Sequence, residues 1–314
     1  MLDGIVADLH AFIAKEKIAG AAVVGHSMGG LAAMMLAKAH PTDADKLMIV
    51  DSLPFIGTLY SPAATTTLIE PQARAMREAQ VASYGKPVNE AAAAAIADRL
   101  AAMKAAGCER ILLAPLYPQY CAATTATAND KAFAYLAGLR WQPAIRTLPP
   151  YYDDSLYIDA LAEDLETSLA ALDFTPDAIV ASFHGMPKRT LQLGDPYHCH
   201  CQKTARLLSE KTGRDLTIAF QSRFGPQKWL GPATDETLVA LAQAGKTRVA
   251  IFAPGFSADC LETLEELSIR GRESFEEAGG THFAYLPCLN DGPAGLAMLR
   301  ALLARELEGW VARG

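Results

Sequence analysis

The sequence has no apolar run long enough to cross a bilayer and no cluster of basic residues. A membrane-spanning helix needs about 20 consecutive apolar residues, so we expect no transmembrane segment, while transient contact with a membrane surface stays open. The N-terminal stretch has no basic segment followed by an apolar one, so we expect no secretory signal peptide. A net charge of −7, with no local excess of Lys or Arg, predicts that nucleic acid is not a partner.

The cysteines are irregularly placed along the chain. The six cysteines of the 314-residue chain lack the spacing of a small secreted disulfide-bonded domain. We therefore expect reduced thiols and a cytoplasmic location. Apolar residues make up 51% and charged residues 20% of the chain, the balance of a globular protein, and the length suffices for two domains.

Apolar runs alternate with alanine- and leucine-rich stretches along the chain. This alternation predicts an α/β fold with parallel sheets. The expected strands are 21–24, 47–50, 110–114, 178–182, 216–220, 248–253 and 282–286. The expected helices are 31–40, 91–106, 157–172, 201–212, 235–244, 259–278 and 293–311.

An internal similarity points to two related halves. Residues 109–117 (ERILLAPLY) resemble residues 247–256 (TRVAIFAPGF), since each segment follows a helix and has a proline where the strand stops. Two doubly wound halves, with a cleft between the C-terminal ends of their strands, would produce this pattern. Chance similarity between two buried strands is the alternative. We expect the bend between the halves near residues 149–155, where PPYYDD interrupts the periodicity.

One histidine follows an apolar strand. His184 comes directly before Gly185, with Pro187 two residues further on, so the strand ends sharply there. Ligands of an open parallel sheet bind beyond the strand C-termini, which would place this imidazole in the cleft. A histidine satisfied by nearby backbone carbonyls is the alternative.

A run of acidic residues follows a second strand end. Asp259 lies in the cap region of the expected helix, and Glu262 and Glu266 are four residues apart and share a helix face. A solvated acidic face that complements the helix dipole is the alternative. If both strand ends face one cleft, His184 and Glu262 would offer an imidazole and a carboxylate to a divalent metal such as Fe²⁺.

Two further loops carry aromatic and polar groups. Residues 116–125 place two tyrosines and two threonine hydroxyls after a first-half strand. Residues 220–232 combine a Gly/Pro-rich loop with Trp229 and two cations. Aromatic faces could contact a flat macrocycle and cations could pair with its acidic groups. Each segment by itself is also consistent with an ordinary loop.

Taken together, these segments resemble the ferrochelatase family over about residues 81–314. The resemblance implies a lyase that inserts Fe²⁺ into a porphyrin, either protoporphyrin IX or coproporphyrin III, in haem biosynthesis. It rests on the motifs LYPQYCAATT, SFHGMP, GDPYHCHC, FQSRFGPQKWLGPATDETL, PGFSADCLETLEEL and YLPCLND.

The resemblance also implies roles for single residues. His184 and Glu262 would form the iron-binding pair, with His184 as the acceptor of the pyrrole protons. Asp259 and Glu266 would deliver the metal. The residues lining the porphyrin pocket would be Tyr120, Thr124 and Trp229.

The chain departs from the family pattern at two places. Many members continue the acidic series four residues beyond Glu266, where this chain has Arg270. Some members carry a 2Fe–2S cluster on cysteines. Cys199 and Cys201, which alternate with histidines, hint at a metal, but no C-terminal cysteine cluster follows, so we expect no such cluster.

Residues 1–80 resemble a different family. GHSMG at 25–29 matches the G-x-S-x-G nucleophile motif between a strand and a helix, as in the strand–helix–strand unit of an α/β-hydrolase. Ser27 would be the nucleophile and Asp51 the acid, but no histidine is an evident base. The usual ferrochelatase start, including the apolar segment that forms a lip over the macrocycle, is replaced.

Three hypotheses follow for function: a ferrochelatase, a serine hydrolase that uses Ser27, and an inactive porphyrin-binding chimera. The expected organisation is a hydrolase-like segment at 1–80, the remainder of the first chelatase-like half at 81–155, and the second half at 156–314. Activity without the N-terminal lip separates the first hypothesis from the third.

Overall fold

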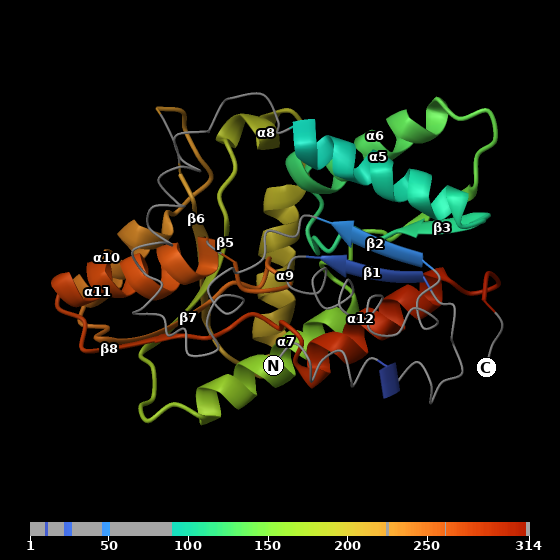
Figure 1. Cartoon of the computed structure of the whole chain (residues 1–314). Coiled ribbons are helices and arrows are strands. Elements are labelled where there is room, and N and C mark those ends of the chain that lie inside the picture. The colour runs from blue at the N-terminus through green and yellow to red at the C-terminus, as the bar shows by residue number, and fades with distance from the viewer. Residues whose placement is uncertain are drawn as a thin grey trace, which may run out of the picture.

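The computed structural model describes residues 10–11, 22–26, 46–50, 90–223, 226–260 and 262–311. Every pair of neighbouring strands within these residues is parallel, and helices lie beside the sheets (Figure 1). The predicted α/β class with parallel sheets is therefore confirmed. None of the described helices combines the length and apolar character needed to cross a bilayer. Ser27, Asp51 and the helix expected at 31–40 lie outside the described residues.

The N-terminal part of the described chain contains two strand pairs. Strand β1 (Ala22–His26) pairs with β2 (Lys46–Val50), and β3 (Arg110–Leu113) pairs with β4 (Ala144–Thr147). Helix α5 (Glu90–Ala105), the π-helical turn η1 (Ala122–Ala126) and α6 (Thr127–Ala137) belong to the same part. Leu100, Met103, Ile111, Leu113 and Leu136 form a buried core between α5, α6 and β3.

The C-terminal part is built on one four-stranded sheet. Its strands lie in the order β6 (Leu216–Gln221), β5 (Ala178–His184), β7 (Arg248–Phe252) and β8 (His282–Tyr285). The helices are α7 (Ser155–Ala170), α8 (Lys188–Gln192), α9 (Tyr197–Thr212), α10 (Thr234–Gln243), η2 (Glu262–Gly271), α11 (Arg272–Glu277) and α12 (Pro293–Glu306).

Both faces of this sheet are buried, which explains why its strands are continuous apolar runs. Successive side chains of a strand point to opposite faces. Phe183 accordingly packs in the core that α7, α9 and α12 cover, whereas Val180 packs in the core beneath α10 and α11. Figure 1 shows α10 and α11 together beside the sheet and α12 alongside α7.

The strand order places a switch point between β5 and β7. The chain leaves β5 for β6 on one side, and it leaves β7 for β8 on the other. Ligands of open α/β sheets bind outside the strand C-termini at such a point. His184 is the last residue of β5, and Pro254–Phe256 follow β7, so both lie at this edge.

Several element boundaries differ from the sequence predictions. The helix expected at 259–278 is the π-helical η2 followed by α11, and it starts at Glu262 rather than Asp259. Helix α9 begins at Tyr197, because Asp195 Oδ1 accepts a hydrogen bond from the Tyr197 N–H at 3.0 Å. The helix expected to run to 311 ends at Glu306.

The residues after α12 tie the two parts of the described chain together. Arg146 on β4 donates a hydrogen bond to the Glu308 carbonyl at 2.9 Å, and its guanidinium lies 4.2 Å from the centre of the Trp310 ring. Arg110 on β3 donates to the Trp310 carbonyl at 2.9 Å. The C-terminal turn therefore contacts both strands of the β3–β4 pair.

Candidate functional site

The imidazole of His184 has a defined tautomer. Its Nδ1 lies 2.7 Å from the Gly185 carbonyl oxygen. A carbonyl oxygen can only accept, so Nδ1 carries the hydrogen and the lone pair of the neutral ring is on Nε2. Nε2 is therefore the nitrogen that can take up a proton or bind a metal.

The backbone around His184 is held on both sides. The Tyr197 hydroxyl donates to the His184 carbonyl at 3.0 Å, and the Gly185 N–H donates to the Gln221 carbonyl at 2.7 Å. A Cβ at residue 185 would lie 2.4 Å from that Gln221 oxygen, so only glycine allows β5 and β6 to approach this closely.

A cavity of about 150 Å³ opens beside His184. Tyr117 from the loop after β3 and Thr124 from η1 line it, together with Phe256 and Cys260 from the loop after β7. Segments far apart in the sequence thus converge on the histidine, as expected for strand-end loops. The other predicted site residues are not among the described residues that line this cavity.

Glu262 approaches the cavity through its neighbour Cys260. The Cys260 thiol donates to Glu262 Oε2 at 3.0 Å, and Cys260 itself lines the cavity. Burial, reinforced by the nearby Glu262 charge, raises the pKa of the Cys260 thiol well above its ordinary value. The thiol is therefore a neutral hydrogen-bond donor that orients the carboxylate.

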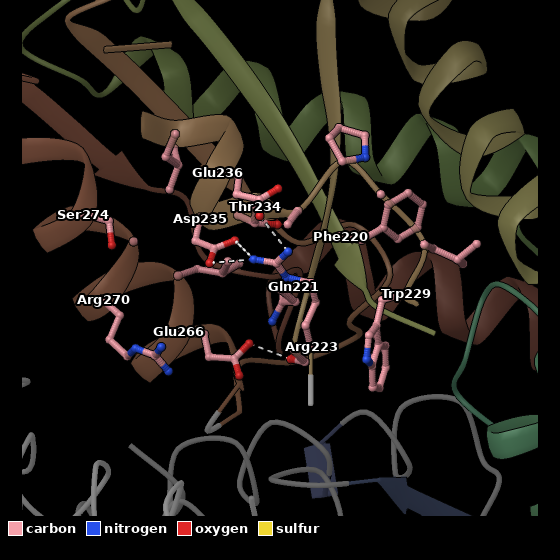
Figure 2. A pocket seen from close by; sticks show the side chains of 18 of the residues that line it. Phe220, Gln221, Arg223, Trp229, Thr234, Asp235, Glu236, Glu266, Arg270 and Ser274 are labelled. Atoms are coloured by element: carbon pink, nitrogen blue, oxygen red, sulfur yellow. Dashed lines mark hydrogen bonds and ion pairs between the residues drawn. The ribbon is translucent and has the colours of Figure 1, made fainter. Parts of the chain in front are cut away.

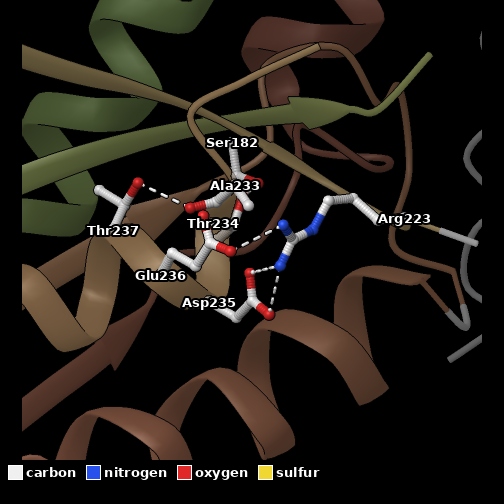
Figure 3. A network of polar contacts seen from close by, with 7 residues as sticks. All are labelled: Ser182, Arg223, Ala233, Thr234, Asp235, Glu236 and Thr237. Carbon is white, nitrogen blue, oxygen red and sulfur yellow. Dashed lines mark hydrogen bonds and ion pairs between the residues drawn. The ribbon is translucent and has the colours of Figure 1, made fainter. Parts of the chain in front are cut away.

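Gln221 connects the His184 strand to the first turn of η2. Its buried side chain donates from Nε2 to the Glu262 carbonyl at 3.1 Å and accepts at Oε1 from Ser182 at 3.0 Å. Ser182 also contacts Thr234 at 2.8 Å between the hydroxyl oxygens (Figure 3). Sequence reasoning assigned no role to Gln221, because its partners lie on elements distant in the chain.

Glu266 lies in a second, more polar pocket of about 860 Å³ (Figure 2). Its Oε2 accepts a hydrogen bond from the Ser222 hydroxyl at 2.6 Å. Trp229 and Arg270 line the same pocket, as does Arg223. The tryptophan predicted to contact porphyrin and the glutamate predicted to deliver iron therefore share a pocket distinct from the His184 cavity.

Arg223 is paired with acidic residues at the start of α10. Its guanidinium lies 2.9 Å from carboxylate oxygens of both Asp235 and Glu236 (Figure 3). Hydrogen bonding to Glu236 raises the pKa of Arg223 further, with burial acting against it and the charge of Asp235 adding to it. These contacts keep one cation of this pocket close to two carboxylates.

Asp259 has hydrogen-bond partners on both carboxylate oxygens. Oδ1 accepts from the Tyr285 hydroxyl and from the Cys288 N–H at 3.2 Å, and Oδ2 accepts from Asn290 Nδ2 at 2.8 Å. The Asp259 N–H in turn donates to Asn290 Oδ1 at 2.8 Å. This carboxylate joins the loop after β7 to the loop after β8.

The two cysteines of segment 198–201 lie in different environments, so they are not side by side as two ligands of one metal would be. Cys199 is exposed, whereas Cys201 is fully buried and its pKa is raised chiefly by that burial. Across the part of the chain that the structure describes, no three His, Cys, Asp or Glu side chains gather as a metal-holding group.

Known proteins similar to this chain were found by sequence and by structure. A family model described as Ferrochelatase matches residues 62–307, starting earlier than the expected residue 81. The ferrochelatase of Rhizobium meliloti (strain 1021) is 57% identical over 231 residues, which are 73% of this chain and 66% of that protein. That of Agrobacterium fabrum (strain C58 / ATCC 33970) is 54% identical, over 73% of this chain and 65% of the relative. The chain thus spans slightly less than two thirds of their length.

A solved structure shares the fold. "SirB from Bacillus subtilis with Fe3+" aligns with a TM-score of 0.54 and 14% identity, covering 90% of this chain and 96% of that one. At this identity the similarity concerns the fold alone. The hydrolase resemblance of residues 1–80 remains a prediction.

Proposed function

The chain belongs to the ferrochelatase family, and from this premise we propose that it inserts Fe²⁺ into a porphyrin in haem biosynthesis, as a lyase located in the cytoplasm. Its partners would be ferrous iron and protoporphyrin IX or coproporphyrin III. The observation that carries the proposal is the placement of His184. His184, whose lone pair lies on Nε2, stands at the sheet switch point beside a cavity that is lined by the segments following β3, β5 and β7.

The reaction exchanges two pyrrole protons for one dication, so the charge of the porphyrin is unchanged while two protons must leave. His184 Nε2 would accept a pyrrole proton, because it carries the lone pair of the neutral ring. Glu262 would bind the incoming iron once its carboxylate oxygen exchanges the Cys260 hydrogen bond for the metal. Gln221, which pairs with His184 in the sheet and bonds to the Glu262 carbonyl, would hold His184 and Glu262 in fixed relative positions.

Delivery of iron would start from the larger polar pocket. Glu266 lies there and is one helical turn from Glu262, so a metal passing between them would move along η2. Asp259 would deliver iron only by giving up one of its internal hydrogen bonds, so we assign it chiefly to holding the loop of Cys260. Arg270 lines the same pocket, and its positive charge would interrupt a continuous path of carboxylates for the metal.

For the porphyrin we propose contacts from Tyr120, Thr124 and Trp229. Thr124 lines the His184 cavity, Tyr120 belongs to the same loop, and Trp229 lies in the neighbouring pocket. Typical ligand pockets measure roughly 300–1,000 Å³, so the His184 cavity has room for the reacting edge of a macrocycle rather than the whole ring.

The test is metal insertion by the purified protein. Fe²⁺ or Zn²⁺ is mixed with each porphyrin, and insertion is followed by the change in the Soret band. His184→Ala should slow insertion by roughly a hundredfold or more, while porphyrin binding, measured by fluorescence quenching, persists. Full activity in this variant would contradict the assignment. Binding without insertion by the unmodified protein would favour the inactive porphyrin-binding hypothesis.

A further inference from the structure

A second histidine contacts the loop that faces the His184 cavity. His200, on α9, accepts a hydrogen bond at Nδ1 from the Tyr120 N–H at 3.1 Å, across 80 residues of sequence. Its ring stacks on Tyr152, with 3.5 Å between centroids and 7° between planes. Tyr120 belongs to the loop that brings Thr124 into the cavity. His200 therefore anchors the loop without reaching the cavity itself.

The Tyr120 hydrogen bond depends on the protonation state of His200. A neutral imidazole has one nitrogen that accepts, whereas the protonated ring has donors on both nitrogens. Protonation would place an Nδ1–H against the Tyr120 N–H, and two donors cannot bond to each other. The stacked ring is also held flat against Tyr152, so it has little freedom to turn its other nitrogen toward the loop.

The charged groups around His200 come from three segments. Asp153 lies before α7, Asp195 before α9, and Lys203 on α9. Lys203 pairs with Asp153 at 2.6 Å. Asp195 Oδ2 accepts from the Ala122 N–H at 2.8 Å, which gives the same loop a second anchor. Loss of the Tyr120 bond would thus remove one of two neighbouring anchors of the loop without releasing it entirely.

We propose that His200 is a positioning residue that docks the loop of residues 117–124 against α9 only while its imidazole is neutral, so that porphyrin binding weakens in acidic solution. The identification of the ligand as a porphyrin rests on the proposed function, whereas the docking of the loop by His200 does not. Since the loop contacts porphyrin rather than iron, the Michaelis constant for porphyrin should change and that for iron should not.

The direction of the pH effect follows from the local environment. Burial, the largest influence, lowers the pKa of His200, while the charges of Asp153 and Asp195 oppose this and Lys203 adds to it. The docked loop therefore binds fewer protons than the released one. Docking is fully present above the ordinary histidine pKa of about 6.5, and it is lost as the pH falls below that value through the lowered pKa of the docked state.

Two variants of His200 separate hydrogen bonding from stacking. His200→Asn puts an amide oxygen near the position of Nδ1, so it can accept the Tyr120 hydrogen bond but does not titrate. His200→Phe keeps the stack on Tyr152 but cannot accept. Circular dichroism and thermal melting establish that both variants fold.

The first measurement is porphyrin affinity by fluorescence quenching between about pH 5 and about pH 8, without iron. Loss of one neutral hydrogen bond should weaken binding about fivefold. On acidification, the porphyrin affinity of the unmodified protein should fall by this factor more than that of His200→Asn does. Titration of the porphyrin itself affects both proteins equally, so the comparison removes it. His200→Phe should bind weakly throughout. Equal pH profiles in all three proteins would overturn the proposal.

The second measurement needs no porphyrin. Hydrogen exchange of the segment 117–124 is compared between the unmodified protein and His200→Asn at each pH. Faster exchange in the unmodified protein at acidic pH only is expected, and identical exchange at every pH would refute docking by His200. Failure of iron insertion with this exchange difference intact would refute the proposed function alone.

Discussion

The hydroxyl of Ser222 donates a hydrogen bond to the carboxylate of Glu266 across 2.6 Å, although the backbone of Ser222 is left-handed, with φ of +64°. Non-glycine residues avoid this conformation, at a cost of about 1–3 kcal/mol. Ser222 is also only 6% exposed. The strained, buried serine therefore holds the carboxylate of Glu266 in one orientation.

Removing the Ser222 hydroxyl should impair iron handling. Ser222→Ala and Ser222→Gly both lose the hydrogen bond, so the Michaelis constant for iron should rise about fivefold in each, with that for porphyrin unchanged. Glycine relieves the backbone strain, so Ser222→Gly should melt at a higher temperature than Ser222→Ala. Ser274→Ala, in the same pocket, is the control and should behave like the unmodified protein. A normal iron constant in both Ser222 variants would contradict the role given to Glu266.

Glu262→Gln keeps the size of the side chain but removes the charge that attracts a dication. We expect insertion to fall roughly tenfold or more, and Glu266→Gln, one turn further along η2, should cost less. The matched control is Glu277→Gln on α11, an exposed glutamate that should tolerate the change. Equal and negligible effects at 262 and 266 would favour a solvated acidic face. Initial rates with Zn²⁺ and a porphyrin provide the measurement.

Asp259→Asn tests whether this carboxylate holds the loops together. The substitution replaces an acceptor bonded to Tyr285, Cys288 and Asn290, so the free energy of unfolding should drop by about 1–3 kcal/mol. Asp235→Asn is the comparison, because the pair of Asp235 with Arg223 is exposed and worth about 0–1 kcal/mol. Urea unfolding followed by tryptophan fluorescence measures both. Equal stability of the two variants would leave delivery of iron as the better role for Asp259.

Thiol reactivity should distinguish the cysteines by burial and pKa. Cys199 is exposed and should react with a maleimide first, so Cys199→Ser should remove the fast phase. Burial raises the pKa of Cys121 to about 11, and it raises that of Cys201 as well. A raised pKa keeps a thiol protonated and unreactive at neutral pH. Mass spectrometry after brief labelling identifies the site, and fast modification of Cys201 would refute its burial.

The nucleophile-like motif at Ser27 should be inactive in ester hydrolysis. A serine needs a base within hydrogen-bond reach to lose its proton, and the sequence offers no evident histidine for it. We expect little hydrolysis of short p-nitrophenyl esters and no stable labelling of Ser27 by a fluorophosphonate. Robust esterase activity that disappears in Ser27→Ala would place the hydrolase hypothesis above the chelatase.

The sequence alone determined the class of the fold and where its chemistry-bearing segments stop and start. Long apolar runs made the central strands recognisable, and the break after His184 placed it at a strand end, because these are local properties of the chain. The four residues of β4 have no such signal, since this short strand carries Arg146 and is only partly buried. Its position is set by pairing with β3.

Only the tertiary structure decided which functional groups meet. The sequence placed Asp259, Glu262 and Glu266 on one helix with a shared purpose, yet the first is tied to the loop after β8, the second to Cys260, and the third to Ser222. Gln221 and His200 act through partners dozens of residues away. Contacts of this kind depend on how sheets and loops come together, and no local pattern of residues encodes them.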